Sequence, residues 1–436
     1  MRVLPHARTR LARSASVWLL LAIVALPAAP AGAATSLELE RLTLANARAL
    51  MLERNRELRL ARHAVESAAA DVTIAGARPN PTLNIGGAHI GSASGPDNPP
   101  LYRRMDASIG VSQLFERGRK RELRVEAAEY AAAAVRGDGL EVERQQRLAV
   151  EQTYYDLVLA QERQRIAAET AALFDKTIDA AERRVKSGDL ARADLARLSV
   201  DALRARNEVE LARQERAKAQ VALGYLLGVE SDAPRIEAAE PWPEIAGSRT
   251  TAPVEQLIER RPDVQAALAR VQQANRNRDL AQSLRTRDVT AGVQFDHTPN
   301  DTVRNGVGFT VSVPLFTRYY YQGEIRRAES EFDAAQTNLE RVRAAAVAEV
   351  AAATAVLTSA GDRVRRFQQN LLAAANQASD AAEFAYTRGA IGVMDLLDAR
   401  RQLYATRLES VNAQADYARA YRAWIAATEP VSGVQP

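Results

Sequence analysis

The stretch YTRGAIGVMDLLDARR, residues 386–401, interrupts a sequence pattern that otherwise predicts helix over about a hundred residues. Gly389 and Gly392 lie in the interruption, and Asp395 and Asp398 follow it three residues apart. Glycine ends helices readily because it adopts left-handed backbone conformations without a steric cost. The stretch therefore predicts a turn between two helices, with two carboxylates in the first turns of the second helix.

A second copy of this pattern lies 201 residues earlier in the chain. The segment KSGDLARADLARL (186–198) aligns Gly188 with Gly389, and the motif L-F-x-R aligns Phe115 with Phe316 at the same offset. In both copies, 73 residues separate the phenylalanine from the glycine. The chain is therefore predicted to consist of two similar halves.

Both halves predict the same order of elements. A weaker match between RNREL (from residue 54) and RRPDV (from residue 260) extends the repeat to the leading helix of each half. Two short helices together match one long helix in length, as parallel packing in one cylinder requires. The first repeat (34–228) predicts a short helix at 43–76, a β-hairpin at about 81–116, a long helix at about 117–187 and a short helix at 189–228. The second (253–428) predicts a short helix at 253–286, a hairpin at about 288–316, a long helix at about 320–388 and a short helix at 390–428, with a linker at 229–252 and a tail at 429–436.

The hairpins are predicted from alternating apolar and small polar residues. In VRNGVGFTVSVPLF, Val307, Phe309 and Val311 alternate with Gly308 and Thr310. Strands of about ten residues cross a bilayer when tilted, and aromatic residues commonly line both edges of such a barrel. The predicted interface aromatics are Phe115, Phe316, Tyr319, Tyr320 and Tyr321.

Four strands are too few to close a membrane barrel, because single-chain barrels begin at about eight strands. If the hairpins enter a membrane, the chain must pool its strands with copies of itself, and any oligomer that reaches eight or more strands satisfies this requirement. The alternative is an ordinary soluble pair of hairpins covered by the helices of the same chain.

The first 33 residues are predicted to be a cleaved signal peptide. They contain four arginines, an apolar core at 17–26 and the small residues AGA at 31–33. Of the 58 basic and 54 acidic residues, these four arginines belong to the leader, which leaves 54 of each sign. A balanced charge removes the main argument for nucleic-acid binding.

No catalytic or cofactor site is predicted. The chain has no cysteine, no phosphate-binding loop, no nucleophile elbow and no zinc-protease motif. His63, His89 and His297 are each isolated in sequence, and a metal site shared by His89 and His297 is less favoured than two solvated loop histidines. No apolar run after the leader approaches the length of about 18 to 20 residues that a membrane helix needs.

The order of leader, hairpin, long helix, glycine turn, D-x-x-D motif and short helix resembles the TolC family of outer-membrane efflux proteins. GVMDLLDARRQLY (392–404) and RRPDVQAA (260–267) are the most specific matches. The resemblance implies a homotrimer with a 12-stranded barrel in the outer membrane of a Gram-negative bacterium and a 12-helix tunnel in the periplasm. It also implies a periplasmic adaptor and an inner-membrane resistance-nodulation-division (RND) pump as partners.

The resemblance assigns roles to residues near the glycine turns. Asp395 and Asp398 match aspartates that ring the tunnel aperture, and Tyr386 and Asp194 match a pair that restrains the closed tip. Ile391 replaces an arginine of the best-known member, so one gating link departs from that pattern. The structural alternative for each aspartate is a favourable interaction with a helix N-terminus, typically about 0.3 to 1 kcal/mol.

Three functional hypotheses follow. Segments such as ARPNPTLNIGG and SVPLFTRYYYQGEI resemble the heavy-metal (cobalt–zinc–cadmium) branch of the family, which predicts a passive exit duct for metal cations. A duct for drugs or for type I protein secretion is the alternative within the family. A soluble periplasmic coiled-coil scaffold or adaptor is the alternative from a different class of protein.

Overall fold

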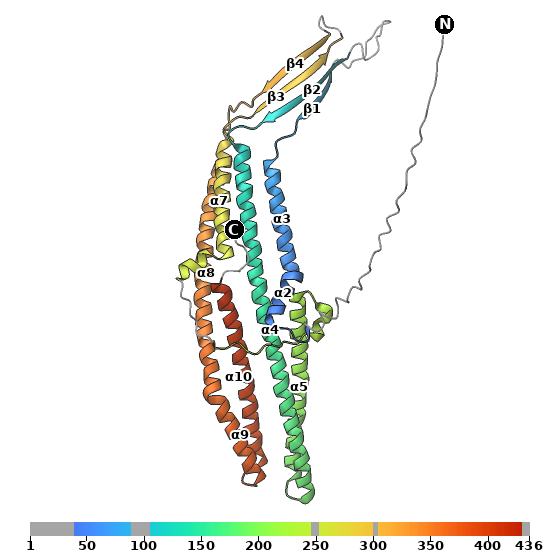
Figure 1. The fold of residues 1–436 in the computed structure, drawn as a ribbon, viewed down its shortest axis with the longest axis vertical. Coiled ribbons are helices and arrows are strands. Elements are labelled where there is room, and N and C mark those ends of the chain that lie inside the picture. The colour runs from blue at the N-terminus through green and yellow to red at the C-terminus, as the bar shows by residue number, and fades with distance from the viewer. Residues whose placement is uncertain (1–38, 89–104, 246–252, 300–303, 430–436) are drawn as a thin grey trace, which may run out of the picture.

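The computed structural model describes residues 39–88, 105–245, 253–299 and 304–429. The predicted signal peptide and His89 lie outside the described residues. Figure 1 shows an elongated molecule with a sheet at one end and long helices that run away from it to a distant tip. Long helices and four antiparallel strands confirm the predicted fold class of the single chain.

The two hairpins form one sheet. Its strands are β1 (Thr82–Ala88), β2 (Asp106–Phe115), β3 (Val289–His297) and β4 (Asn305–Ser312), in the order β1-β2-β3-β4 with every neighbouring pair antiparallel. The β2–β3 pairing therefore joins the two repeats, and β1 and β4 form the edges.

One face of this sheet is apolar and exposed. Leu83, Val111, Val293 and Phe309 lie in one row across the four strands, and their exposed fractions range from 50% to 82%. The neighbouring row on the opposite face consists of Asn84, Gly110, Gln294 and Gly308. Such a one-sided apolar face, uncovered by the helices of the chain, favours contact with lipid over contact with water.

The long helices differ between the repeats. Helix α4 (Lys120–Ser187) is continuous over 68 residues, a length of about 100 Å. Its counterpart consists of α8 (Gln322–Arg366), a π-helical turn η3 (Phe367–Leu371) and α9 (Leu372–Thr387). The extra residue of a π-turn shifts the helix face locally, which sequence periodicity does not reveal. The returning helices are α5 (Arg192–Leu227) and α10 (Val393–Thr428).

Each leading helix is divided in two, where the sequence predicted one helix. The first pair is α2 (Leu44–Arg54) and α3 (Arg56–Gly76), and the second is α6 (Val254–Glu259) and α7 (Pro262–Ser283). Asn55 adopts an extended conformation and caps α3 by accepting a hydrogen bond from the Leu58 N–H at 3.1 Å. Pro262 disfavours a helical Arg261, which is extended as well.

The short helices stack end to end beside the long ones, with α3 above α5 and α7 above α10 (Figure 1). We call the two stacking points junction 1, in the first repeat, and junction 2, in the second. The linker follows α5 as a 3-10 helix η2 (Glu230–Arg235) and pairs with the start of the first repeat through the Leu42–Ala238 bridge. Its Trp242 ring stacks on Tyr155 of α4 at 6.1 Å.

Junction 1 is mainly apolar. Leu42, Tyr154, Leu157 and Leu223 are fully buried in the core cluster around it. Its buried amide, Asn55, donates to the Leu226 carbonyl at 2.8 Å and to the Gln146 side chain at 3.2 Å. The Tyr154 hydroxyl donates to the Leu42 carbonyl at 2.9 Å, and burial raises the pKa of this hydroxyl to about 12.

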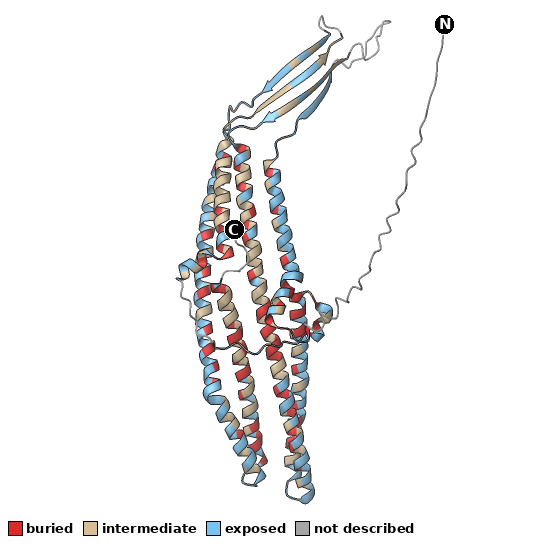
Figure 2. Ribbon diagram, in the orientation of Figure 1, coloured by how far each residue is buried: buried red, intermediate tan, exposed pale blue. Residues whose placement is uncertain are grey.

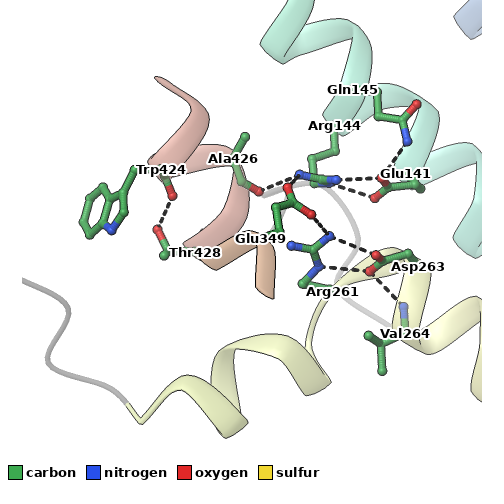
Figure 3. A network of polar contacts seen from close by, with 10 residues as sticks. All are labelled: Glu141, Arg144, Gln145, Arg261, Asp263, Val264, Glu349, Trp424, Ala426 and Thr428. Carbon is green, nitrogen blue, oxygen red and sulfur yellow. Dashed lines mark hydrogen bonds and ion pairs between the residues drawn. The ribbon is translucent and has the colours of Figure 1, made fainter. Parts of the chain in front are cut away.

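Junction 2 combines an apolar cluster, which includes Ile258, Val264 and Val350, with a network of charges (Figure 3). Arg144 of α4 donates to Glu349 at 3.0 Å, to the Ala426 carbonyl at 3.1 Å and to Glu141 at 2.7 Å. Arg261 donates to Glu349 at 2.7 Å and to Asp263 at 2.9 Å. Burial alone would lower the pKa of Arg144, but Glu141 and Glu349 raise it above its ordinary value.

Figure 2 shows buried residues concentrated where helices meet, whereas the strands are exposed or half-buried. Among the described residues, one helical run, Gln322–Thr387, is long and apolar enough by composition to cross a membrane. Its most apolar 18-residue window has a mean hydropathy of 1.5 and is 28% buried. This corrects the sequence prediction that no such run exists. The prediction failed because it considered only uninterrupted apolar runs, whereas this apolar character comes from closely spaced alanines in AAAVAEVAAATAV (344–356), which Glu349 interrupts.

Candidate functional site

The tip farthest from the sheet contains both predicted glycine turns. Helix α4 ends before Gly188, which has a φ of 84°, and the Asp189 N–H donates to the Arg184 carbonyl at 2.8 Å. In the second repeat, Gly389 has a φ of 73° and the Ala390 N–H donates to the Ala385 carbonyl at 2.8 Å. A positive φ favours glycine, so the two residues reverse the chain in the same way.

Asp395 interacts with the N-terminus of its own helix. Its carboxylate accepts a hydrogen bond from the Gly392 N–H at 3.2 Å, which satisfies an otherwise unpaired donor at the start of α10. Its side chain is exposed at the tip. The capping contact therefore coexists with the predicted aperture role, which stays a prediction.

Asp398 belongs to a charge network that joins the two repeats. It is 71% exposed and pairs with Arg401 at 3.2 Å, and Arg401 also pairs with Asp201 of α5 at 2.6 Å. Asp201 is 8% exposed. Arg401 thus connects an exposed carboxylate of the second repeat to a buried carboxylate of the first.

Arg400 makes a second connection between the repeats. It is buried, donates to the Thr177 hydroxyl of α4, and lies 3.5 Å from Glu383 of α9. Burial lowers its pKa, and the charge of Glu383 offsets only part of this effect. We call the Arg400–Thr177 and Arg401–Asp201 contacts the tip clamp.

Sequence reasoning missed the tip clamp because both arginines resembled ordinary solvated charges. A signal was available, since Val393, Leu396, Leu397 and Arg400 follow the spacing of a buried helical stripe. The first three are buried, and the arginine extends the same stripe into the interface.

Tyr386 and Asp194 have separate neighbours. The Arg184 guanidinium lies 5.1 Å from the centre of the Tyr386 ring, which packs against the apolar cluster of the tip. Asp194 pairs with Arg197 at 3.4 Å on its own helix. In the described part of the chain, no hydrogen bond joins Tyr386 to Asp194. The predicted restraint between them therefore stays a prediction.

The predicted interface aromatics lie where the strands end. Phe115 is the last residue of β2 and is 54% exposed, whereas Phe316 contacts Tyr320 at 6.4 Å and Tyr321 at 5.3 Å between ring centres. Tyr319 contacts Tyr321 at 6.1 Å. These rings gather at the helical end of the apolar face.

The described residues contain no group of three or more His, Asp or Glu side chains placed to hold a metal ion. His297 contacts the Asn305 side chain at 2.7 Å. His89 lies outside the described residues, so a site shared by the two histidines is not tested.

A sequence model of the family described as "Outer membrane efflux protein" matches residues 47–229 and 254–428. The cobalt-zinc-cadmium resistance protein CzcC of Cupriavidus metallidurans is 27% identical over 311 residues, which cover 67% of this chain and 70% of CzcC. The cation efflux system protein CusC of Escherichia coli O157:H7 is 26% identical over 376 residues, covering 82% and 79%. The pyoverdine export outer membrane protein OpmQ of Pseudomonas aeruginosa is 26% identical over 373 residues, covering 79% and 76%.

The fold is similar to a solved structure. The outer membrane protein VceC from Vibrio cholerae superposes with a TM-score of 0.73 at 20% sequence identity, covering 89% of this chain and 96% of VceC. At this identity the likeness concerns the fold alone.

Proposed function

The chain belongs to the outer membrane efflux protein family, and from this premise we propose that it forms a homotrimeric exit duct for heavy-metal cations. Proteins of this family are transport channels rather than enzymes, and they lie in the outer membrane of Gram-negative bacteria with helices that extend into the periplasm. The duct would dock to a periplasmic adaptor and an inner-membrane RND pump, which supplies the energy.

The observation that carries the proposal is the exposed apolar face of an open four-stranded sheet. In a membrane, unpaired edges such as those of β1 and β4 must be satisfied by further strands. Three copies related by a threefold axis supply twelve strands, and the same axis places three sets of long helices around the barrel axis. The alternative of a soluble scaffold loses support, because such a protein would leave this apolar face in water.

The metal substrate is supported by the names of two relatives, CzcC and CusC, at 27% and 26% identity. A second candidate, export of an organic compound such as a drug, is favoured by the similar identity of 26% to OpmQ. Type I protein secretion has no comparable support among these relatives. The lack of a metal-binding cluster among the described residues is compatible with metal export when the pump selects the substrate.

Deletion of the gene tests the substrate class. The deletion strain is grown on graded zinc, cobalt and cadmium and on a panel of drugs, with the restored gene as a control. We expect the tolerated metal concentration to fall while drug tolerance is unchanged. Loss of drug tolerance alone would replace the metal proposal with the organic one.

The aperture is tested by conductance in planar bilayers. Asp395→Ala with Asp398→Ala should reduce cation selectivity and weaken block by multivalent cations, because a ring of carboxylates attracts cations. The exposed Asp179→Ala variant on α4 is the charge control. Unchanged selectivity and block in the double variant would place these aspartates away from the constriction.

We propose that contacts between the two helical hairpins at the tip hold the duct closed. Tyr386→Phe with Asp194→Ala tests the restraint that the family resemblance implies, and Arg401→Gln tests the Arg401–Asp201 contact of the tip clamp. Each should raise the conductance if it restrains the tip. A rise in Arg401→Gln alone would assign the restraint to the tip clamp.

A further inference from the structure

We propose that the base of the sheet, where the strands continue into the helices, binds the headgroups of anionic phospholipids in the periplasmic leaflet. The inference depends on the outer-membrane placement of the sheet and goes beyond the duct function. It arises from the four connectors between strands and helices, residues 77–81, 116–119, 284–288 and 313–321. These connectors contain six basic and two acidic residues.

All six basic residues are arginines, and all six are exposed. We call them the basic collar: Arg78, Arg117, Arg119, Arg285, Arg287 and Arg318. Arg119 pairs with Glu126 at 3.3 Å. The side chains of the other five have no carboxylate within ion-pair distance among the described residues. Unpaired guanidinium groups at a membrane surface suit phosphate, which they bind in a planar, two-pronged geometry.

The two acidic residues of the connectors do not neutralise this charge, because α4 already binds them. Glu116 accepts from Arg124 at 2.8 Å, and Asp288 accepts from Lys120 at 2.8 Å. At the opposite end of the sheet the described charges are mixed, with Asp106 and Asp296 alongside Arg304. The positive charge is therefore concentrated at the helical end of the described sheet.

The basic collar is continuous with the apolar face. Phe115 and Leu315 are 54% and 74% exposed at this edge, next to the aromatic cluster. The Arg287 guanidinium lies 5.3 Å from the centre of the Phe316 ring, which orients a positive charge beside the predicted lipid interface. Acyl chains along the apolar face and a phosphate against the arginines would satisfy both surfaces at once.

A cavity at this edge provides room for a headgroup. It has a volume of about 670 Å³ and lies below β1 and β2, with Arg78 and Phe115 among its lining residues. Glu116 and Glu122 also line it, but they pair with Arg124 at 2.8 Å and with Arg121 at 3.5 Å. The unpaired Arg78 is suited to phosphate, and the phenylalanine and prolines to the glycerol and first methylene groups. The observed charge and apolar continuity favour a phospholipid over a soluble anion.

Lipid retention tests the proposal. The full-length chain is folded into vesicles of phosphatidylcholine that contain about one-tenth phosphatidylglycerol, extracted in mild detergent, and the retained lipids are quantified by mass spectrometry. Wild type should retain phosphatidylglycerol in excess of its share, and about 0.5 M salt should reduce the excess because it screens exposed charges. About 10 mM inorganic phosphate should leave the lipid bound; its displacement by phosphate would indicate a phosphate site and overturn the lipid proposal.

A triple variant, Arg117→Gln with Arg285→Gln and Arg318→Gln, should reduce the excess by about tenfold or more. The matched control is Arg59→Gln with Arg183→Gln and Arg192→Gln, three exposed arginines without an ion pair on the periplasmic helices. Retention that is unchanged in the collar variant, or equally reduced in the control, overturns the proposal. If the triple variant does not assemble, Arg285→Gln alone and the salt series on wild type decide the result.

Conductance separates this inference from the duct function. Wild-type channels that conduct in pure phosphatidylcholine but show no preference for phosphatidylglycerol overturn the lipid proposal alone. A chain that forms no channel in either lipid overturns the duct function as well.

Discussion

Junctions 1 and 2 occupy equivalent places in the two repeats, yet they are built from different chemistry. At junction 1 a neutral amide, Asn55, reaches the carbonyl of Leu226 near the end of α5. At junction 2 a charged Arg144 reaches the carbonyl of Ala426 near the end of α10. Each contact satisfies a carbonyl that a helix end leaves without a partner.

The difference shows that the repeat conserves the path of the helices rather than the contacts that hold them. Asn55 aligns with Arg261 in the sequence repeat, and both residues adopt an extended conformation between two helices. Both junctions have an apolar core, but junction 1 surrounds a neutral amide with it, whereas junction 2 adds two buried arginines balanced by three carboxylates. The two junctions should therefore respond differently to mutation and to pH.

The largest expected effect is at the apolar core of junction 1. Leu157→Ala removes a fully buried side chain and should lower the free energy of unfolding by about 3 kcal/mol. Urea unfolding followed by circular dichroism measures the loss, with the exposed Leu203→Ala of α5 as a control. A loss as small as that of the control would show that this core is loosely packed.

Removing a charge from junction 2 should cost about 2 kcal/mol. Arg144→Leu leaves Glu141 without its ion-pair partner, whereas Glu349 keeps its contact with Arg261. Both carboxylates are partly exposed, so the cost is below that of a fully buried pair. The same unfolding measurement checks this value. Adding Glu141→Leu to Arg144→Leu should recover part of the loss, because Arg144 is the ion-pair partner of Glu141, and a further loss instead would contradict this pairing.

The amide of junction 1 should contribute less. Asn55→Ala removes the cap of α3 and the hydrogen bond to Leu226, with an expected loss of about 1 kcal/mol. Asn55→Ser keeps a neutral capping acceptor but loses the donated bond to Leu226, so it should fall between wild type and alanine. Equal stability of the alanine variant and wild type would show that Asn55 does not stabilise junction 1.

The smallest expected effect is a loss of stability at low pH that arises from Asp263 of junction 2. Burial would raise the pKa of Asp263, but hydrogen bonds and charge from Arg261 outweigh it and lower the pKa below its usual value. The stability that the ionised Asp263 carboxylate contributes is fully present above its pKa in the unfolded chain, about 4. This contribution is lost as the pH falls through its lower pKa in the folded protein. Wild type should therefore lose more stability on acidification than Asp263→Asn, with Asp179→Asn as the exposed control. Equal acid sensitivity of wild type and Asp263→Asn would contradict this role.

Local rules in the sequence predicted much of this protein. Gly188 and Gly389 identified both tip turns because a left-handed backbone favours glycine, and the alternation around Phe309 identified a strand with one apolar face. The same rules missed the division at Asn55 and the π-turn at Phe367–Leu371. An asparagine or a run of good helix formers does not by itself indicate where a helix is interrupted.

Apart from the helix interruptions, the order of helices and strands, the internal repeat and the polarity of the strands were predictable from the sequence, because they follow from periodicity and from residues with special backbone preferences. Only the tertiary structure showed that β2 pairs with β3, that Arg400 and Arg401 join the repeats at the tip, and that the arginines of the basic collar meet at one edge. These contacts connect residues far apart in the chain. An arginine in a sequence looks the same whether it faces water, a carboxylate or a membrane, and the fold decides which of these surrounds it.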